Sequence, residues 1–178
     1  MENGQVELQE PQPFQSIHHA ADFDCGVIHM NEWLRKHGLD PHNARTYVAL
    51  TDDGRVGAYY CLAAGSVERK SAPGKLKRNA PDPIPAVVLG RMAVDIDFQR
   101  KGIGGMLVAH AKVMAYQAAR IAGARLLILT ARTTELIPWY AEHGFVSSEA
   151  DTREMMIAMA TIEVEIAAAQ AAEAEALR

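Results

Sequence analysis

A glycine-rich segment near the middle of the chain has the residue types best suited to binding a phosphorylated ligand. It reads Gln-Arg-Lys-Gly-Ile-Gly-Gly, follows an apolar run and leads into a helical pattern. Glycines let the backbone approach a ligand closely, and unpaired N–H groups at a helix start bind pyrophosphate. The arginine and lysine add positive charge. The predicted pyrophosphate loop, called the glycine loop below, consists of Gln99, Arg100, Lys101, Gly102, Ile103, Gly104 and Gly105.

The spacing of this loop excludes two other phosphate-binding motifs. A dinucleotide fold requires GxGxxG and an acidic residue about 20 positions later. Here the pattern is GxGG, and arginine occupies position 120. A Walker loop requires GK followed by Ser or Thr, which the segment lacks.

A second candidate for chemistry is Tyr140, which lies in the segment Trp-Tyr-Ala-Glu-His-Gly-Phe. A positioned tyrosine hydroxyl can protonate a leaving group, and such an acid contributes roughly 10²- to 10⁴-fold to a rate. The alternative interpretation is a packed aromatic residue. Glu135, Glu142 and His143 fit solvated helix positions as well as they fit a general base, so no dedicated base is predicted.

The histidines and cysteines predict neither a metal site nor a disulfide. His110 and the pair His18 and His19 lack a second ligand at metal-binding spacing. Cys25 and Cys61 are too few for a disulfide framework and are expected to be buried thiols.

The net charge of −4 conceals a basic segment between residues 68 and 78, where five cations face one acid. This segment is either a solvated loop or a contact for nucleic-acid phosphates, and composition does not choose between them. It is called the basic loop below. Its cations are Arg69, Lys70, Lys75, Lys77 and Arg78.

Hydrophobic periodicity predicts helices and strands in an order typical of one mixed α/β domain. We expect Asp24 to cap the first helix and Gly38 to end it, and Gly54 to turn a hairpin. Apolar positions from Ile103 to Ile121 predict one long helical stripe that Gly123 closes. The expected helices are 24–37, 103–121, a short one from Thr133 or Thr134 to Gly144, and 161–178; the expected strands are 46–50, 56–62, 87–94, 126–130 and 155–159.

The chain has no apolar run of the roughly 20 residues that a membrane span requires, and residues 1–14 are acidic rather than signal-like. No membrane association is predicted, and a cytoplasmic location is expected. At 178 residues the chain is the size of one domain.

The glycine loop resembles the coenzyme A-binding motif of the GNAT acetyltransferases, Gln-x-x-Gly-x-Gly, here Gln99, Gly102 and Gly104. The resemblance implies acetyl-CoA as co-substrate, no metal, and a GNAT fold with a mixed, mostly antiparallel sheet flanked by helices. It also implies that Tyr140, in an element like YxxxGF, stands near the coenzyme sulfur as general acid. By the same resemblance a GNAT domain spans 14–160, followed by a helical extension over 161–178. The strand residues implied to pair with pantetheine are Met92, Ala93 and Val94.

Over residues 14–159 the chain resembles the GNAT toxins of toxin–antitoxin modules, through segments such as Phe-Asp-Cys-Gly and Leu-Gly-Arg-Met-Ala-Val-Asp. This resemblance implies transfer of acetyl to the α-amine of aminoacyl-tRNA, a ribbon-helix-helix antitoxin and a homodimer. Lys77, Arg78 and Arg91 are the expected tRNA contacts. Two alternatives stay open, an acetyltransferase for small or protein amines and a non-catalytic CoA-binding protein.

Overall fold

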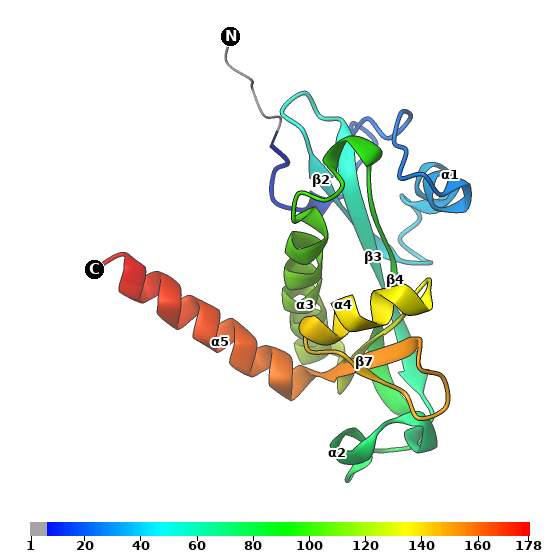
Figure 1. Ribbon diagram of the computed structural model, residues 1–178, viewed down its shortest axis with the longest axis vertical. Coiled ribbons are helices and arrows are strands. Elements are labelled where there is room, and N and C mark those ends of the chain that lie inside the picture. Colours follow the sequence, from blue (N-terminus) through cyan, green and yellow to red (C-terminus); the bar gives the residue numbers. More distant parts are fainter. Residues whose placement is uncertain (1–6) are drawn as a thin grey trace. The chain divides into compact units, whose positions relative to one another are not determined.

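The computed structural model describes residues 7–178. Their strands form a seven-stranded sheet in the order β1-β2-β3-β4-β5-β7-β6 (Figure 1). The pairs β1–β2, β2–β3, β5–β7 and β6–β7 are antiparallel. The mixed, mostly antiparallel α/β class is therefore confirmed.

The helices and strands have the following bounds. The strands are β1 (Gln12–Pro13), β2 (Arg45–Leu50), β3 (Val56–Val67), β4 (Ile84–Val94), β5 (Leu126–Thr130), β6 (Val146–Ser147) and β7 (Glu154–Ala158). The helices are α1 (Ile28–His37), α2 (Gly74–Lys77), α3 (Ile103–Ala122), α4 (Ile137–Glu142) and α5 (Met159–Ala176). Three short 3₁₀ turns are η1 (Arg69–Ser71), η2 (Ile96–Phe98) and η3 (Thr134–Leu136).

The described chain forms two compact units. The first unit contains the chain through Ala63 together with residues 89–110. The second unit contains residues 64–88 and 111–178. The glycine loop belongs to the first unit, whereas Tyr140 and the basic loop belong to the second.

In the first unit, α1 packs on the β2–β3 hairpin around a core that includes Phe23, Leu34 and Tyr59. The hairpin turns at Gly54, whose φ of 82° confirms the predicted turn. The prediction that Asp24 caps α1 is wrong, because the helix begins only at Ile28. The Asp24 carboxylate instead accepts the backbone N–H of Gly26 at 2.8 Å, in a turn where Gly26 has a φ of 82°.

Strands β3 and β4 are longer than the sequence predicted. The predicted end of β3 was residue 62, but the strand continues to Val67, and β4 begins at Ile84 instead of residue 87. Pro85 lies inside β4, and its carbonyl accepts the N–H of Arg125 at 2.9 Å. A proline is tolerated there because the strand uses its carbonyl and needs no N–H at that position.

In the second unit, the later turns of α3 bury Ala111 and Ala115, but Ile121 is 88% exposed. The predicted apolar stripe was therefore wrong in its last turn, because Ile121 does not lie on the buried face of α3. Gly144 has a φ of 89° after α4 and is followed by the buried Phe145, as predicted.

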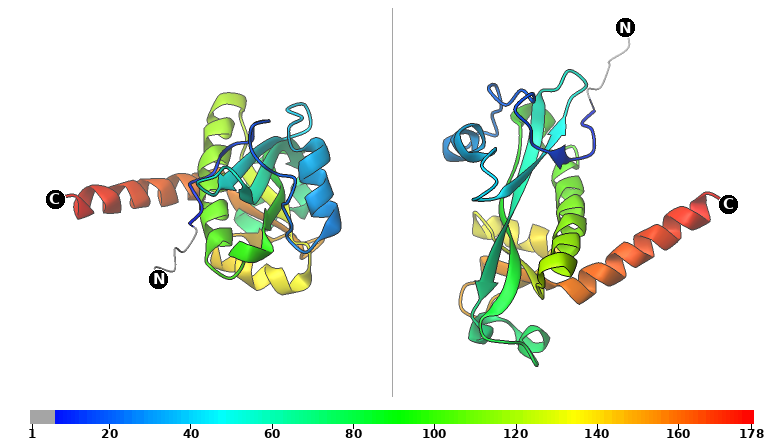
Figure 2. Two further views of the ribbon diagram at one scale, coloured as in Figure 1. Left: turned by 90° about the horizontal axis from the view of Figure 1, so that it is seen from above. Right: turned by 180° about the vertical axis from the view of Figure 1, so that it is seen from behind.

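Helix α5 is anchored only by its first turns. Met159 and Ile162 are buried, and Lys112 on α3 forms a 2.6 Å ion pair with Glu165. The Tyr116 hydroxyl also donates to Glu163 at 2.6 Å. Beyond these contacts α5 extends away from β5 and β7, with no other element of the second unit beside it (Figure 2). Among the described helices, none combines the length and apolarity needed to cross a membrane.

Candidate active site

The segment between β4 and the glycine loop is fixed by one buried carboxylate in the first unit. Asp95 is only 1% exposed and accepts the backbone N–H groups of Asp24 and Asp97, each at 3.0 Å. The Arg55 guanidinium donates to Asp95 at 3.0 Å and to Asp97 at 2.7 Å. No sequence motif assigned a role to Asp95 or Arg55, because their pairing spans about 40 residues and only the fold brings them together.

Gln99, predicted from the motif to bind the coenzyme, makes its hydrogen bonds inside the protein. Its side-chain amide donates to the carbonyl of Val94 at 2.8 Å and to that of Cys25 at 3.0 Å. The side chain thus joins the end of β4 to the segment before α1. These contacts indicate that Gln99 holds the shape of the glycine loop.

The glycine loop has the backbone geometry of an anion cradle. Gly102 has a φ of 80°, and a Cβ placed on it would have no neighbour within 4 Å. Arg100 has a φ of 60°, a conformation that costs energy for a residue with a side chain. Strained backbone of this kind is typical of ligand-binding loops.

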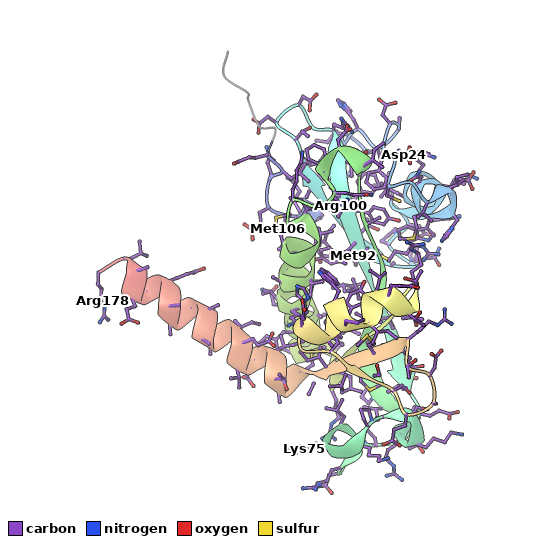
Figure 3. All side chains as sticks on the ribbon, in the orientation of Figure 1. Asp24, Lys75, Met92, Arg100, Met106 and Arg178 are labelled. Carbon is purple, nitrogen blue, oxygen red and sulfur yellow. The ribbon has the colours of Figure 1, made fainter. Side chains whose placement is uncertain are left out.

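The start of α3 supplies unpaired donors beside this cradle. The N–H of Met106 bonds to the Gly102 carbonyl at 3.3 Å, so the amides of residues 103–105 precede the helical bonding pattern. Arg100 is exposed and forms no ion pair with another described residue (Figure 3). Lys101 is held near the loop by a 2.8 Å bond to the Asp97 carbonyl. Open space, helix amides and two cations fit the pyrophosphate of a coenzyme.

The end of β4 has an arginine fixed by an aromatic residue. The Arg91 guanidinium lies 4.6 Å from the centre of the Trp33 ring, and Trp33 stacks on Tyr59. Arg91 is half-buried and has no ion pair with a described residue. It directly precedes the predicted pantetheine-pairing residues Met92, Ala93 and Val94, of which Ala93 is buried and the others are half-buried.

In the second unit, Tyr140 is held rigidly by two aromatic neighbours. Its ring lies edge-on to Trp139 at 4.9 Å and to Phe145 at 6.0 Å, and the residue is 8% exposed. Burial raises the pKa of Tyr140 above its usual value, and the positive charge of Arg132 only partly opposes this. The hydroxyl makes no hydrogen bond to another described residue, and its oxygen is not sealed from solvent. Tyr140 therefore holds a proton that it can donate.

The residues considered as a base have other roles in the second unit. A backbone N–H and the Thr133 hydroxyl lower the pKa of Glu135, which makes it a weak base. The His143 ring bonds to the Trp139 carbonyl at 2.8 Å. Glu142 is exposed. Arg132 was not predicted from the sequence as a site residue, yet its positive charge opposes the rise that burial causes in the pKa of Tyr140.

The structure separates the cations of the basic loop into paired and unpaired ones. Lys70 pairs with Glu68 at 2.9 Å, and Lys77 pairs with Glu149 at 3.1 Å. Lys75 and Arg78 are exposed and form no ion pair with a described residue; Lys75 projects from the turn at α2 (Figure 3). Arg69 is also exposed, but its guanidinium donates to the Ala80 carbonyl at 3.3 Å. Lys75 and Arg78 are therefore the two cations of the loop whose side chains bond to no other described residue.

The two cysteines and the groups that could bind a metal are the remaining candidates. Cys61 is buried, and burial raises the pKa of its thiol, while Cys25 is half-buried. Within residues 7–178, no group of three or more His, Cys, Asp or Glu side chains is arranged to hold a metal ion.

Comparison with known proteins identifies the family of the chain. Residues 42–147 match the family described as acetyltransferase (GNAT) domain. This match covers more than half of the chain, which therefore belongs to the GNAT acetyltransferases.

Within this family the chain is similar to several toxins. A tRNA-acetylating toxin from Mycobacterium tuberculosis is 34% identical over 152 residues, which are 84% of this chain and 91% of the toxin. AtaT complexed with acetyl-methionyl-tRNA is 26% identical, with a TM-score of 0.81 over 90% of this chain and 99% of AtaT. A mutant AtaT bound to the C-terminus of the antitoxin AtaR and acetyl-CoA is 25% identical, with a TM-score of 0.74 over 89% of this chain and 98% of that one.

Proposed function

We propose that this protein is an acetyl-CoA-dependent N-acetyltransferase that acetylates the α-amine of aminoacyl-tRNA and thereby blocks translation as the toxin of a toxin–antitoxin pair. The observation that carries the proposal is the glycine loop, with the open Gly102 cradle at the start of α3. Membership of the GNAT family and similarity to a tRNA-acetylating toxin support the same function.

The glycine loop would hold acetyl-CoA by its pyrophosphate. The amides of residues 103–105 and the charges of Arg100 and Lys101 suit a doubly anionic group. Gln99 and Asp95 would keep this loop in its binding shape. The backbone of residues 92–94 would pair with pantetheine, as the family resemblance implies.

The chemistry is attack of a neutral amine nitrogen on the thioester carbonyl, which forms a C–N bond and breaks the C–S bond. The departing thiolate needs a proton, and Tyr140 would supply it as general acid. Burial raises the pKa of Tyr140, so its hydroxyl is protonated at neutral pH and has a proton to give. The proton lost by the amine passes to solvent, since none of the described residues stands out as its base.

Exposed positive charge supports tRNA as the acceptor substrate. Lys75 and Arg78 are accessible for phosphates, and Arg91 is an unpaired cation held by Trp33. Lys77 would have to exchange Glu149 for a phosphate. AtaT, a similar toxin, has been solved with acetyl-methionyl-tRNA.

Three further features belong to this proposal. We expect a ribbon-helix-helix antitoxin as protein partner, a homodimer in solution and a cytoplasmic location. The structure of AtaT with the C-terminus of its antitoxin AtaR supports the expectation that an antitoxin binds this toxin directly.

The experiment that tests the function measures CoA release from acetyl-CoA with charged or uncharged tRNA. We expect release only with charged tRNA, and a loss of roughly 10²-fold or more in Tyr140→Phe. Tyr116→Phe is the matched control, because the Tyr116 hydroxyl donates to an exposed glutamate on α5. If charged tRNA stimulates no release, the tRNA substrate is wrong.

The same assay separates the alternative functions. Release with small amines or peptides, unaffected by Lys75→Glu and Arg78→Glu, would identify an acetyltransferase for small or protein amines. Binding of acetyl-CoA without turnover of any amine would identify a CoA-binding interaction protein. For the tRNA substrate we expect both charge reversals to weaken binding, and affinity to fall steeply as salt increases.

A further inference from the structure

The second unit contains a cavity of about 330 Å³ that none of the assigned roles uses. Its lining combines five polar residues with four apolar ones, Val67, Val88, Ile128 and Leu129. The cavity lies at the end of the apolar cluster that contains Val67 and Ile128. Its size is within the range of ligand pockets, and its mixed lining suits a ligand that has both an apolar and a polar part.

The strand register places one carboxylate at this cavity. Thr130 of β5 pairs with Glu154 of β7, and Ile128 pairs with Met156, so Ile128, Thr130 and Glu154 lie on one face of the sheet. Glu154 is half-buried and lines the cavity. The other polar groups are the hydroxyls of Ser66, Ser71 and Thr130 and the carboxylate of Glu68.

Of the two carboxylates, Glu154 is the one whose side chain has no partner in the described part of the chain. Glu68 pairs with Lys70 at 2.9 Å. The side chain of Glu154 makes no hydrogen bond or ion pair with another residue in the described part of the chain. Its backbone is fixed, because its N–H donates to the Asp151 carbonyl at 3.0 Å and its carbonyl accepts the Ser148 N–H at 2.7 Å. Glu154 is therefore a positioned acceptor available to a ligand.

We infer that this cavity receives the side chain of the aminoacyl group, and that Glu154 selects a side chain with an apolar stem and a cationic end, as in lysyl- or arginyl-tRNA. The inference rests on the proposed function. The aminoacyl group is the cationic end of a substrate that is otherwise polyanionic, so an acidic pocket fits this end and repels phosphates. The accessible cations Lys75 and Arg78, in the same unit, suit the phosphates.

The α-ammonium is a poorer match for Glu154 than the side chain. The α-amine must lose its proton and leave any tight carboxylate partner before it can attack a thioester. A side-chain ammonium or guanidinium can stay bound throughout the reaction. The apolar lining contacts the stem while the charge meets Glu154, as long cationic side chains usually lie. The residues that line the cavity belong to the same unit as Tyr140, the proposed general acid.

The test uses the full chain and one tRNA charged separately with lysine, arginine, leucine or glycine, with acetylation of each measured at limiting concentration. We expect the highest kcat/KM for lysyl- and arginyl-tRNA. Glu154→Gln should lower those two values by roughly ten- to a hundredfold and leave the glycyl value unchanged. Glu154→Leu should shift the preference towards leucyl-tRNA. Glu173→Gln, a change at an exposed position of α5, is the matched control.

The result that overturns the inference is a wild-type preference for glycyl- or leucyl-tRNA that Glu154→Gln does not alter. An equal loss on all four substrates would also overturn it, because that would indicate a structural role for Glu154. Either result leaves the proposed function standing, since acetylation of charged tRNA would still be observed. If none of the four charged tRNAs is acetylated while bulk charged tRNA is, the inference fails and the proposed function stands. If bulk charged tRNA is not acetylated either, the proposed function fails as well.

Discussion

Replacing Asp95 tests the idea that one buried carboxylate holds the glycine loop. In Asp95→Ala, the N–H groups of Asp24 and Asp97 lose their 3.0 Å acceptor, and Arg55 loses one of its two carboxylates. Asp24 and Asp97 are exposed, so water partly replaces the lost bonds and each costs only about 0.5–1.5 kcal/mol.

The ion pair adds a smaller amount than a fully buried pair would. Breaking a buried pair costs about 3–5 kcal/mol, but the Arg55 side chain is 33% exposed and keeps Asp97 at 2.7 Å. We therefore assign about 1 kcal/mol to it. The total expected loss in the free energy of unfolding is about 2–4 kcal/mol. Asp95→Asn, which retains one acceptor oxygen, should lose about half as much.

Equilibrium urea unfolding at neutral pH measures these losses, and steady-state kinetics measures the KM for acetyl-CoA. Asp97→Asn is the control, because its side chain is 59% exposed and should cost less than about 0.5 kcal/mol. We also expect Asp95→Asn to raise the KM for acetyl-CoA. A loss below about 1 kcal/mol in Asp95→Ala, with an unchanged KM, would show that Asp95 does not hold the loop.

Three further predictions concern other contacts. In steady-state kinetics, Gln99→Ala should raise the KM for acetyl-CoA more than it lowers kcat, because it removes the hydrogen bonds to the carbonyls of Val94 and Cys25. Burial lowers the pKa of His110, so its contribution to stability is complete above about pH 6.5 and is lost as pH falls through the lowered pKa. Urea titrations from pH 7.5 to 4.5 should show this loss in the wild type and a smaller one in His110→Gln. Ending the chain after residue 168 should leave the Tm unchanged, whereas ending it before Met159 should cost about 3–6 kcal/mol, because Met159 and Ile162 are buried.

The sequence predicted elements whose signals are local. The turn at Gly54, strand β5 at Leu126–Thr130 and the end of α4 at Gly144 were predicted correctly, since each depends on a glycine or a short apolar run. The start of α1 was predicted wrongly because Asp24 caps a turn at Gly26 and not the helix. Nothing in the local pattern distinguishes these two uses of an aspartate.

The site divides in the same way between local and long-range information. The glycine loop could be proposed from the sequence because spacing alone defines it, and its role in binding acetyl-CoA stays a prediction. The contacts that hold it could not be predicted, because they join residues far apart in the sequence. Asp95 bonds to Arg55 in the turn between β2 and β3, and Gln99 bonds to Cys25 across 74 positions. Nothing in the sequence indicated that the Trp33 ring holds the Arg91 guanidinium, because the two residues lie far apart along the chain.

The basic loop shows why composition alone could not decide how its charges are used. Five cations face one acid in sequence, yet in the fold Glu149 from a distant segment pairs with Lys77, and Lys70 is paired locally. The Arg69 guanidinium donates a hydrogen bond to the Ala80 carbonyl, so its charged group lies against the backbone that follows α2. Lys75 and Arg78 keep the exposed positive charge that a phosphate can reach. Under the proposed function, the paired cations would shape the loop and the unpaired ones would meet the phosphates of the tRNA.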